Sequence, residues 1–182
     1  MGLISRLASL IFKAATKGAF KEFESMTADK LLELSDADLV MAVIVRTDSG
    51  GNATEDSGAL ESLNDAQRAA YTIARFDMEL QNGGLLQYFS NTSRFTAPYL
   101  ADALKEIGAL KTQALFSDFV SKHSIDVSDL GRFAAETEEE YARTYEHYPF
   151  DDTDSSFYSV YETENLEALC AAFIREHISN FA

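Results

Sequence analysis

Apolar side chains recur every three or four positions along most of this chain, the spacing that gathers them on one face of an α-helix. Only nine glycines and two prolines interrupt the 182 residues, which is few for a sandwich or barrel built on many turns. The pattern predicts a single all-α domain of roughly seven helices. The longer helices are expected over residues 63–81, 97–107, 112–123, 129–148 and 163–180.

The first 25 residues differ from the rest of the chain. Apolar residues at helical spacing alternate there with Lys and Arg, which predicts a basic amphipathic helix over 1–25 ahead of an acidic all-α domain over 26–182. The basic face is sparse, so packing or self-association is favoured over binding to a membrane. Charges interrupt the apolar run and no cleavage site follows it, which argues against a signal peptide. No run of about 18 apolar residues suggests a membrane span. We therefore expect a cytoplasmic protein.

The segment QNGGLLQYFSN, residues 81–91, breaks a helical run with two glycines and restarts at once with apolar residues. Gly83 and Gly84 predict a corner between two helices, with the positive φ that ends the first helix at Asn82 or Gly83. The free N–H groups of the second helix are expected to bond to Glu79 or Asn82. The amides and tyrosine around the break could hold the corner together through side-chain hydrogen bonds, or they could line a small polar pocket. Their spacing favours the hydrogen-bonded corner. The residues concerned are Glu79, Asn82, Gly83, Gly84, Gln87, Tyr88 and Asn91.

Acidic residues outnumber basic ones by 30 to 15, which gives the chain a net charge of −15. Residues 126–182 contain fourteen acids and three bases and so contribute −11 of that charge. Such a chain repels phosphates, which argues against direct binding to DNA or RNA and favours a basic protein partner.

The acids of residues 129–154 are predicted to lie opposite an aromatic stripe on the helix over 129–148 and in an acid-lined loop after it. They form the candidate partner-binding surface. Arg132 and Arg143 share this side, and Glu139 is placed to pair with Arg143 four residues later. A solvent-exposed helix face that carries ion pairs and binds no partner would show the same pattern. The candidate partner-binding residues are Asp129, Glu136, Glu139, Glu140, Glu146, Asp151, Asp152 and Asp154.

No motif in the sequence indicates catalysis, a metal or a cofactor. The three histidines are far apart, and zinc-protease, hydrolase, phosphate-loop and dinucleotide signatures are absent from the sequence. A calcium loop starting at Asp151 or Asp152 lacks the required glycine and several ligands. Cys170 is the single cysteine, so it forms no disulfide within the chain and is expected to be buried. We expect a protein that is not an enzyme and has no catalytic residues, metal or cofactor.

The segments FDMELQNGGLLQYFSN (76–91), LADALKEIGA (100–109) and LCAAFIREHI (169–178) together resemble the bacterial DNA-mimic protein family, whose shared domain is otherwise of unknown function. The resemblance covers about residues 35–181. Leu85 replaces the aromatic residue usual after the glycines, and Arg94 replaces a glycine. The resemblance implies an all-α fold. For the one well-known activity of the family, it also implies an acidic homodimer that occupies the DNA-binding surface of a helix-turn-helix transcription factor.

Three functional hypotheses remain open from the sequence. The first is a non-enzymatic module whose acidic surface binds a basic DNA-binding protein. The second is an immunity or antitoxin-like partner of a basic toxin, which needs the same charge. The third is a small-ligand-binding protein that uses a pocket at the Gly-Gly corner.

Overall fold

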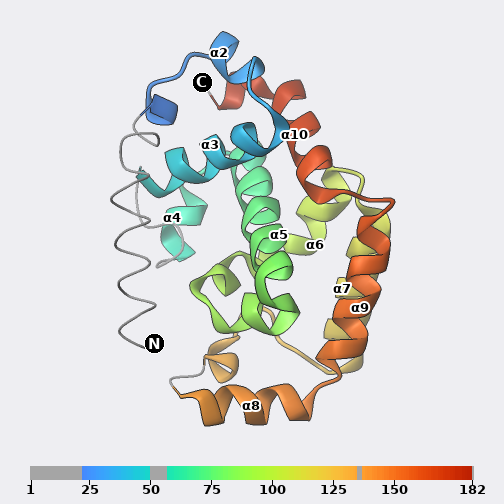
Figure 1. The fold of residues 1–182 in the computed structure, drawn as a ribbon. Helices are drawn as coiled ribbons and strands as arrows, with labels where there is room; N and C mark the ends of the chain where they lie inside the picture. Colours follow the sequence, from blue (N-terminus) through green and yellow to red (C-terminus); the bar gives the residue numbers. More distant parts are fainter. Residues whose placement is uncertain (1–21, 50–56, 135–136, 182) are drawn as a thin grey trace.

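The computed structural model describes residues 22–49, 57–134 and 137–181, and the regular structure in these ranges is helical throughout (Figure 1). The predicted all-α class is therefore confirmed. Most of the basic helix expected over 1–25 lies outside the described residues. The helices are α2 (Ala28–Leu32), α3 (Asp36–Ser49), α4 (Ser57–Glu61), α5 (Asp65–Ser90), α6 (Ala97–Glu106), α7 (Leu110–Lys122), α8 (Glu138–His147), α9 (Phe150–Tyr161) and α10 (Leu166–Glu176), with short 3₁₀ turns η1 (Thr92–Thr96), η2 (Gly131–Phe133) and η3 (Ile178–Asn180).

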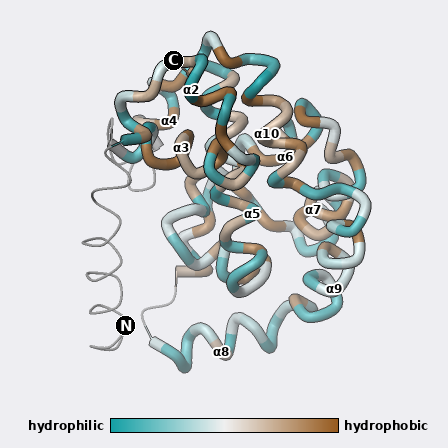
Figure 2. Tube along the Cα trace, turned by 45° about the horizontal axis from the view of Figure 1, so that its top comes forward, coloured by the Kyte–Doolittle hydropathy of each residue, from teal (hydrophilic) through white to brown (hydrophobic). Residues whose placement is uncertain are grey.

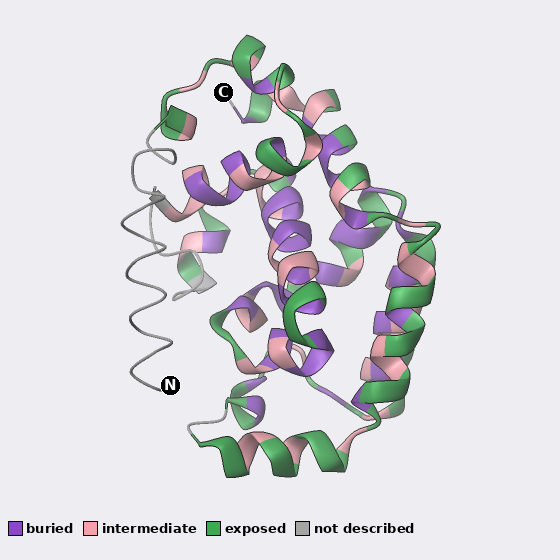
Figure 3. Ribbon diagram, viewed as in Figure 1, coloured by how far each residue is buried: buried purple, intermediate pink, exposed green. Residues whose placement is uncertain are grey.

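Helix α5 runs through the middle of the molecule, and α3, α6, α9 and α10 pack around it (Figure 1). A capping box begins it, in which Asn64 Oδ1 accepts from the Gln67 N–H at 2.9 Å and Gln67 Oε1 accepts from the Asn64 N–H at 3.2 Å. Much of α5 is buried, as Figure 3 shows, because its apolar residues face neighbours on several sides. Helices α7 and α9 pack side by side along one edge.

Aromatic rings fill the core between α5, α7 and α9. Phe76 makes edge-to-face contacts with Tyr88, Phe116 and Phe157, with ring centroids 5.1, 6.2 and 5.8 Å apart. Phe89 lies 5.0 Å from Phe133 of η2. Contacts of this geometry contribute about 0.5–1.5 kcal/mol each beyond the burial of the rings. The core thus joins the two sides of the Gly-Gly corner to the C-terminal helices.

Two predictions about residues 129–162 are wrong. The helix expected over 129–148 is instead the 3₁₀ turn η2 followed by a separate α8, because Thr137 starts a new helix with a capping box to Glu140. The acid-lined loop expected after it is the helix α9, which begins after Pro149 with Asp151 and Asp152 in its first turn. Carboxylates at that position stabilise a helix through its dipole, so the acidic run favours a helix start.

The last helix also begins later than predicted, at Leu166, with Asn165 as the N-cap. Glu164, just before it, caps a different helix. Its carboxylate accepts from the backbone N–H groups of Lys111 (2.9 Å) and Thr112 (2.9 Å) at the start of α7. Burial acts to raise the pKa of Glu164, but these hydrogen bonds outweigh it and lower the pKa. The loop before α10 is thereby fixed to α7.

None of the described helices combines the length and apolar character needed to cross a membrane.

Candidate functional site: the Gly-Gly corner and the acidic arm

The backbone leaves helical geometry at both glycines of the corner, as predicted. Gly83 has φ −169°, an extended value that any residue adopts, whereas Gly84 has φ +76° and ψ −170°. The positive φ therefore falls at Gly84, and its expected position at Asn82 or Gly83 is wrong. This conformation is open almost only to glycine, because it brings a Cβ into contact with the neighbouring peptide.

Helix α9 holds the broken helix from both sides of the corner. Asp154 Oδ1 accepts from the N–H of Leu85 at 2.9 Å, at the start of the second half of α5. The Tyr158 hydroxyl donates to the carbonyl of Leu80 at 2.9 Å, near the end of the first half. Asp154 and Tyr158 are one turn apart on α9, so one face of a single helix satisfies a free donor and a free acceptor of the break. The sequence-based expectation that Glu79 or Asn82 would accept the N–H bond is wrong.

Glu79 instead organises side chains beyond the corner. It is 5% exposed and accepts three hydrogen bonds: from Gln87 Nε2 at 2.8 Å, from Asn91 Nδ2 at 2.8 Å and from Ser93 Oγ at 2.6 Å. Gln87 and Asn91 do share a face, as their four-residue spacing predicts. The hydrogen bond from Ser93 was not expected from the sequence, because it depends on the turn η1, which brings Ser93 back to Glu79. These three hydrogen bonds offset the free-energy cost of burying the Glu79 carboxylate away from water.

Tyr88 belongs to a separate hydrogen-bonded pair. It is fully buried, and its hydroxyl lies 2.7 Å from Thr96 Oγ1, which in turn donates to the carbonyl of Ser93 at 2.8 Å. Burial raises the pKa of Tyr88 well above its ordinary value, with the charge of Glu79 adding to the effect. The hydroxyl bonds to Thr96 and is held neutral, an arrangement that serves packing.

We call residues 137–162, which comprise α8 and α9, the acidic arm. Helix α8 crosses one end of the molecule, contains no buried residue and is hydrophilic along its length (Figures 2 and 3). Tyr145 on α8 donates to the Asp151 carboxylate at the start of α9, which links the two helices. The exposed acids of the arm are Glu138, Glu139, Glu146, Asp151, Asp152 and Glu162.

The other candidate partner-binding residues have different surroundings. Asp129 is exposed in the turn before η2, and Glu136 lies outside the described residues. Glu140 is partly buried and caps α8. Asp154 bonds to the corner, and its pKa is raised by burial against the lowering effect of the Leu85 N–H. Of the candidate residues, Glu139 and Glu146 on α8 and Asp151 and Asp152 on α9 are the exposed ones of the arm.

Arg143 does not pair with Glu139, contrary to the prediction from their spacing. The ion pairs in the described part of the chain join Arg68 to Asp65, Arg75 to Asp48 and Arg175 to Asp36. The exposed acids of the arm participate in none of them. The six exposed acids outnumber Arg143, the one Lys or Arg residue of the arm, so the field of the arm is negative.

Sequence analysis did not identify Asp77, a half-buried acid on α5 beside the acidic arm. Gln81 Nε2 and the Tyr161 hydroxyl donate to it over 3.4 Å each. Burial raises the pKa of Asp77 to about 6, the two donors oppose that rise, and the charge of Glu167 adds to it. Asp77 itself helps burial to raise the pKa of Tyr161 to about 12. Only the packing of α9 and α10 on α5 creates this environment, so no sequence motif marks it.

Replacing Asp77 by asparagine should stabilise the protein at pH 8 by about 2 kcal/mol, from 1.4 kcal/mol per pKa unit with a discount for partial exposure. The pKa of Asp77 is raised on folding, so its ionised form destabilises the fold above pH 6 and its protonation restores stability as the pH falls. The advantage of Asp77→Asn should therefore shrink through pH 6 and be lost near pH 4. Urea unfolding across this pH range measures it, with Asp102→Asn on the surface of α6 as the control for one lost charge. An advantage that persists near pH 4 would assign the gain to something other than this carboxylate.

No group of three or more His, Cys, Asp or Glu in the described ranges is arranged to hold a metal ion. Cys170 is fully buried, as expected, and burial raises the pKa of its thiol far above the ordinary value.

A family model described as DMP19-like protein matches residues 61–177, which include the corner, the acidic arm and the whole of α10. The chain belongs to the DMP19-like protein family. The resemblance inferred from the glycine motif is thus confirmed at the level of the family. No curated protein and no solved structure matches the chain. Within this DMP19-like protein, the matched region begins at the end of α4, so α2 and α3 lie outside it.

Proposed function

We propose that this DMP19-like protein is a non-enzymatic protein-binding module whose acidic arm occupies the DNA-binding surface of a basic protein. The observation that carries the proposal is the state of the six exposed acids on the arm, which form no ion pair with the described Lys and Arg residues. Such carboxylates compete with phosphates for the basic side chains of a DNA-binding protein. Family membership supports the same role, because DMP19-like proteins are a family of DNA mimics.

The corner contributes to this function by positioning the arm. Asp154 and Tyr158 anchor α9 to α5, and Phe157 between them is buried in the aromatic core. An acidic surface fixed before binding loses less conformational entropy when the partner docks. In this role the glycines, Asp154 and Tyr158 position the surface and do not contact the partner.

The two other hypotheses fit the structure less specifically. A basic toxin would bind the same carboxylates, so an immunity role remains the alternative within the same chemistry. A ligand at the corner would need polar groups free to receive it. Gln87, Asn91 and Ser93 already donate to Glu79, and Tyr88 is bonded to Thr96. The corner is thus occupied by its own side chains.

Displacement of DNA tests the proposal directly. A basic DNA-binding protein retained from host lysate at low salt would be purified and bound to fluorescein-labelled duplex DNA. Addition of the DMP19-like protein should release the DNA, measured by fluorescence anisotropy, and log affinity should fall linearly with log salt concentration. Simultaneous binding of DNA and the acidic protein would contradict mimicry. A retained protein without DNA affinity would support the immunity role instead.

A further inference from the structure

Two open hollows run side by side across the end of the molecule where η2 faces α8. One has a volume of about 600 Å³ and lies between η2 and the helix α8. The other, of about 440 Å³, lies between η1 and the turn before η2. Gly131 lines both of them, so they are neighbours, and we call them together the Arg trough. Its principal side chains are Arg94, Phe95, Pro98, Arg132, Phe133, Arg143, His147 and Tyr148.

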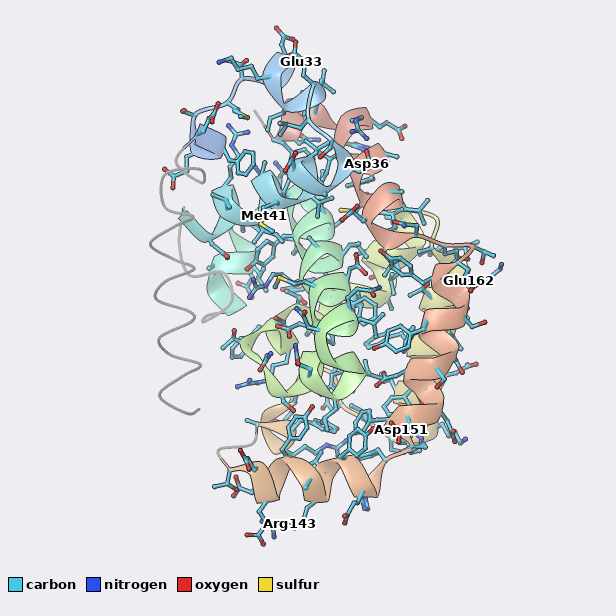
Figure 4. The ribbon with its side chains drawn as sticks, in the orientation of Figure 1. Glu33, Asp36, Met41, Arg143, Asp151 and Glu162 are labelled. Carbon is cyan, nitrogen blue, oxygen red and sulfur yellow. The ribbon has the colours of Figure 1, made fainter. Side chains whose placement is uncertain are left out.

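The Arg trough contains the described arginines that form neither an ion pair nor a side-chain hydrogen bond to a distant part of the chain. Arg68, Arg75 and Arg175 pair with carboxylates, and Arg46 donates to the carbonyls of Met26 and Phe181. The three other arginines of the described residues are Arg94, Arg132 and Arg143, and all three line the trough. Arg143 is exposed on α8, where Figure 4 labels it.

Two of these guanidinium groups are held over aromatic rings of the trough wall. Arg94 lies 5.0 Å from the centroid of Phe95, and Arg132 lies 5.0 Å from the centroid of Phe133. Arg94 also donates through Nη1 to the carbonyls of Ser90 and Asn91, which leaves its Nη2 without a partner. An arginine stacked on a ring keeps its planar edge available for a bidentate bond to a carboxylate or phosphate.

The trough also contains two acids, Asp129 and Glu140, and its net charge is +1 with His147 neutral. Glu140 accepts from the N–H of Thr137 and so is engaged in capping α8. The trough is a positive strip within residues 126–182, whose net charge is −11. The ligand of the trough must therefore differ from the basic partner proposed for the acidic arm, because the two surfaces attract opposite charges.

We propose that the Arg trough binds an acidic peptide segment in an extended conformation, with its carboxylates on the arginines and its apolar side chains against Phe95, Pro98 and Tyr148. The trough is open to solvent, which suits a peptide better than an enclosed small molecule. Its lining combines arginines with aromatic and apolar side chains, and an extended chain whose side chains point alternately to opposite sides can contact both kinds. A nucleic-acid strand also pairs phosphates with arginine and stacks on rings, but its denser charge is repelled by the surrounding acids.

The probe is a fluorescein-labelled peptide of roughly ten residues in which Glu alternates with Phe and Leu. Full-length protein should raise its fluorescence anisotropy in a saturable manner. The variants Arg132→Gln and Arg143→Gln should each weaken binding by about tenfold, the loss expected for one charge-assisted bond. Lys105→Gln, which removes one positive charge from the surface of α6, should leave the affinity within about twofold. Thermal unfolding of each variant separates lost binding from lost folding, and Arg143 has no hydrogen bond in the structure that its substitution would remove.

Equal losses in Lys105→Gln and the two arginine variants would overturn the proposal, since the effect would then follow net charge. Absence of saturable binding by the unmodified protein would overturn it as well. Tighter binding of a labelled oligothymidine than of the peptide would assign the trough to single-stranded nucleic acid. None of these outcomes bears on DNA displacement by the acidic arm, so this proposal and the proposed function can fail separately.

Discussion

Replacing Gly84 by alanine should lower the free energy of unfolding by about 3 kcal/mol or more, which combines backbone strain with overpacking. The strain arises because Gly84 has φ +76° and ψ −170°. The overpacking arises because an added Cβ would lie 2.0 Å from Asp154 Oδ2 and 2.6 Å from its Cγ. That carboxylate cannot retreat without losing its bond to the Leu85 N–H. Urea unfolding monitored by circular dichroism measures the loss.

Gly108→Ala is the matched control for this substitution. Gly108 follows α6 with φ +82°, but nothing lies within 4 Å of an added Cβ. Its replacement should therefore cost only the positive φ, about 1 kcal/mol. Adding Asp154→Ala to Gly84→Ala should recover part of the packing cost, because it removes the atom that the new Cβ meets. Equal costs for Gly84→Ala and Gly108→Ala would show that Asp154 does not constrain the corner.

Reversing three carboxylates of the acidic arm should weaken binding to the basic partner by about 100-fold or more at low salt, because six units of charge change where phosphates would bind. The variant Glu139→Lys, Glu146→Lys, Asp152→Lys changes exposed residues that form no ion pair in the described chain. Glu140 and Asp154 are left intact because each bonds to backbone. The DNA displacement assay gives the affinity. The difference in affinity between the variant and the unmodified protein should become smaller as added salt screens the charges of the arm.

The control for charge reversal changes the same net charge elsewhere. Glu33 directly after α2, Glu106 on α6 and Glu176 on α10 are exposed acids outside the acidic arm. Their joint reversal to Lys should weaken binding much less, because screening confines the effect of an exposed charge to roughly 10 Å. Similar losses in the two triple variants would mean that the partner responds to net charge. The arm would then not be its binding surface.

The position of the corner at Gly83–Gly84 could be predicted from the sequence, but its detailed geometry could not. Two adjacent glycines within a helical run indicate a break, and the spacing of Gln87 and Asn91 correctly placed both amides on one face. Which glycine takes the positive φ depends on what approaches the backbone there. Asp154 does so from 69 residues away, and no local pattern reveals that contact.

In the C-terminal region the sequence gives the charge correctly but not the helices. Its net charge of −11 is fixed by the sequence, but the helix predicted over 129–148 is interrupted and the predicted loop after it is helical. The capping box at Thr137 and the acids after Pro149 are the local signals that would have located both helix starts. Whether Glu139 pairs with Arg143 depends on side-chain placement, which spacing alone does not fix.

For this protein the sequence by itself determined the helical class, the place of the corner, the burial of Cys170 and the sign and distribution of charge. These follow from periodicity, composition and local backbone preference, each of which acts over a few residues. The tertiary structure decided that α9 holds both sides of the broken α5, that Asp77 becomes a poor acid, and that three arginines share one trough. Each of these depends on contacts between residues far apart in the chain, where burial and approach distance set the chemistry.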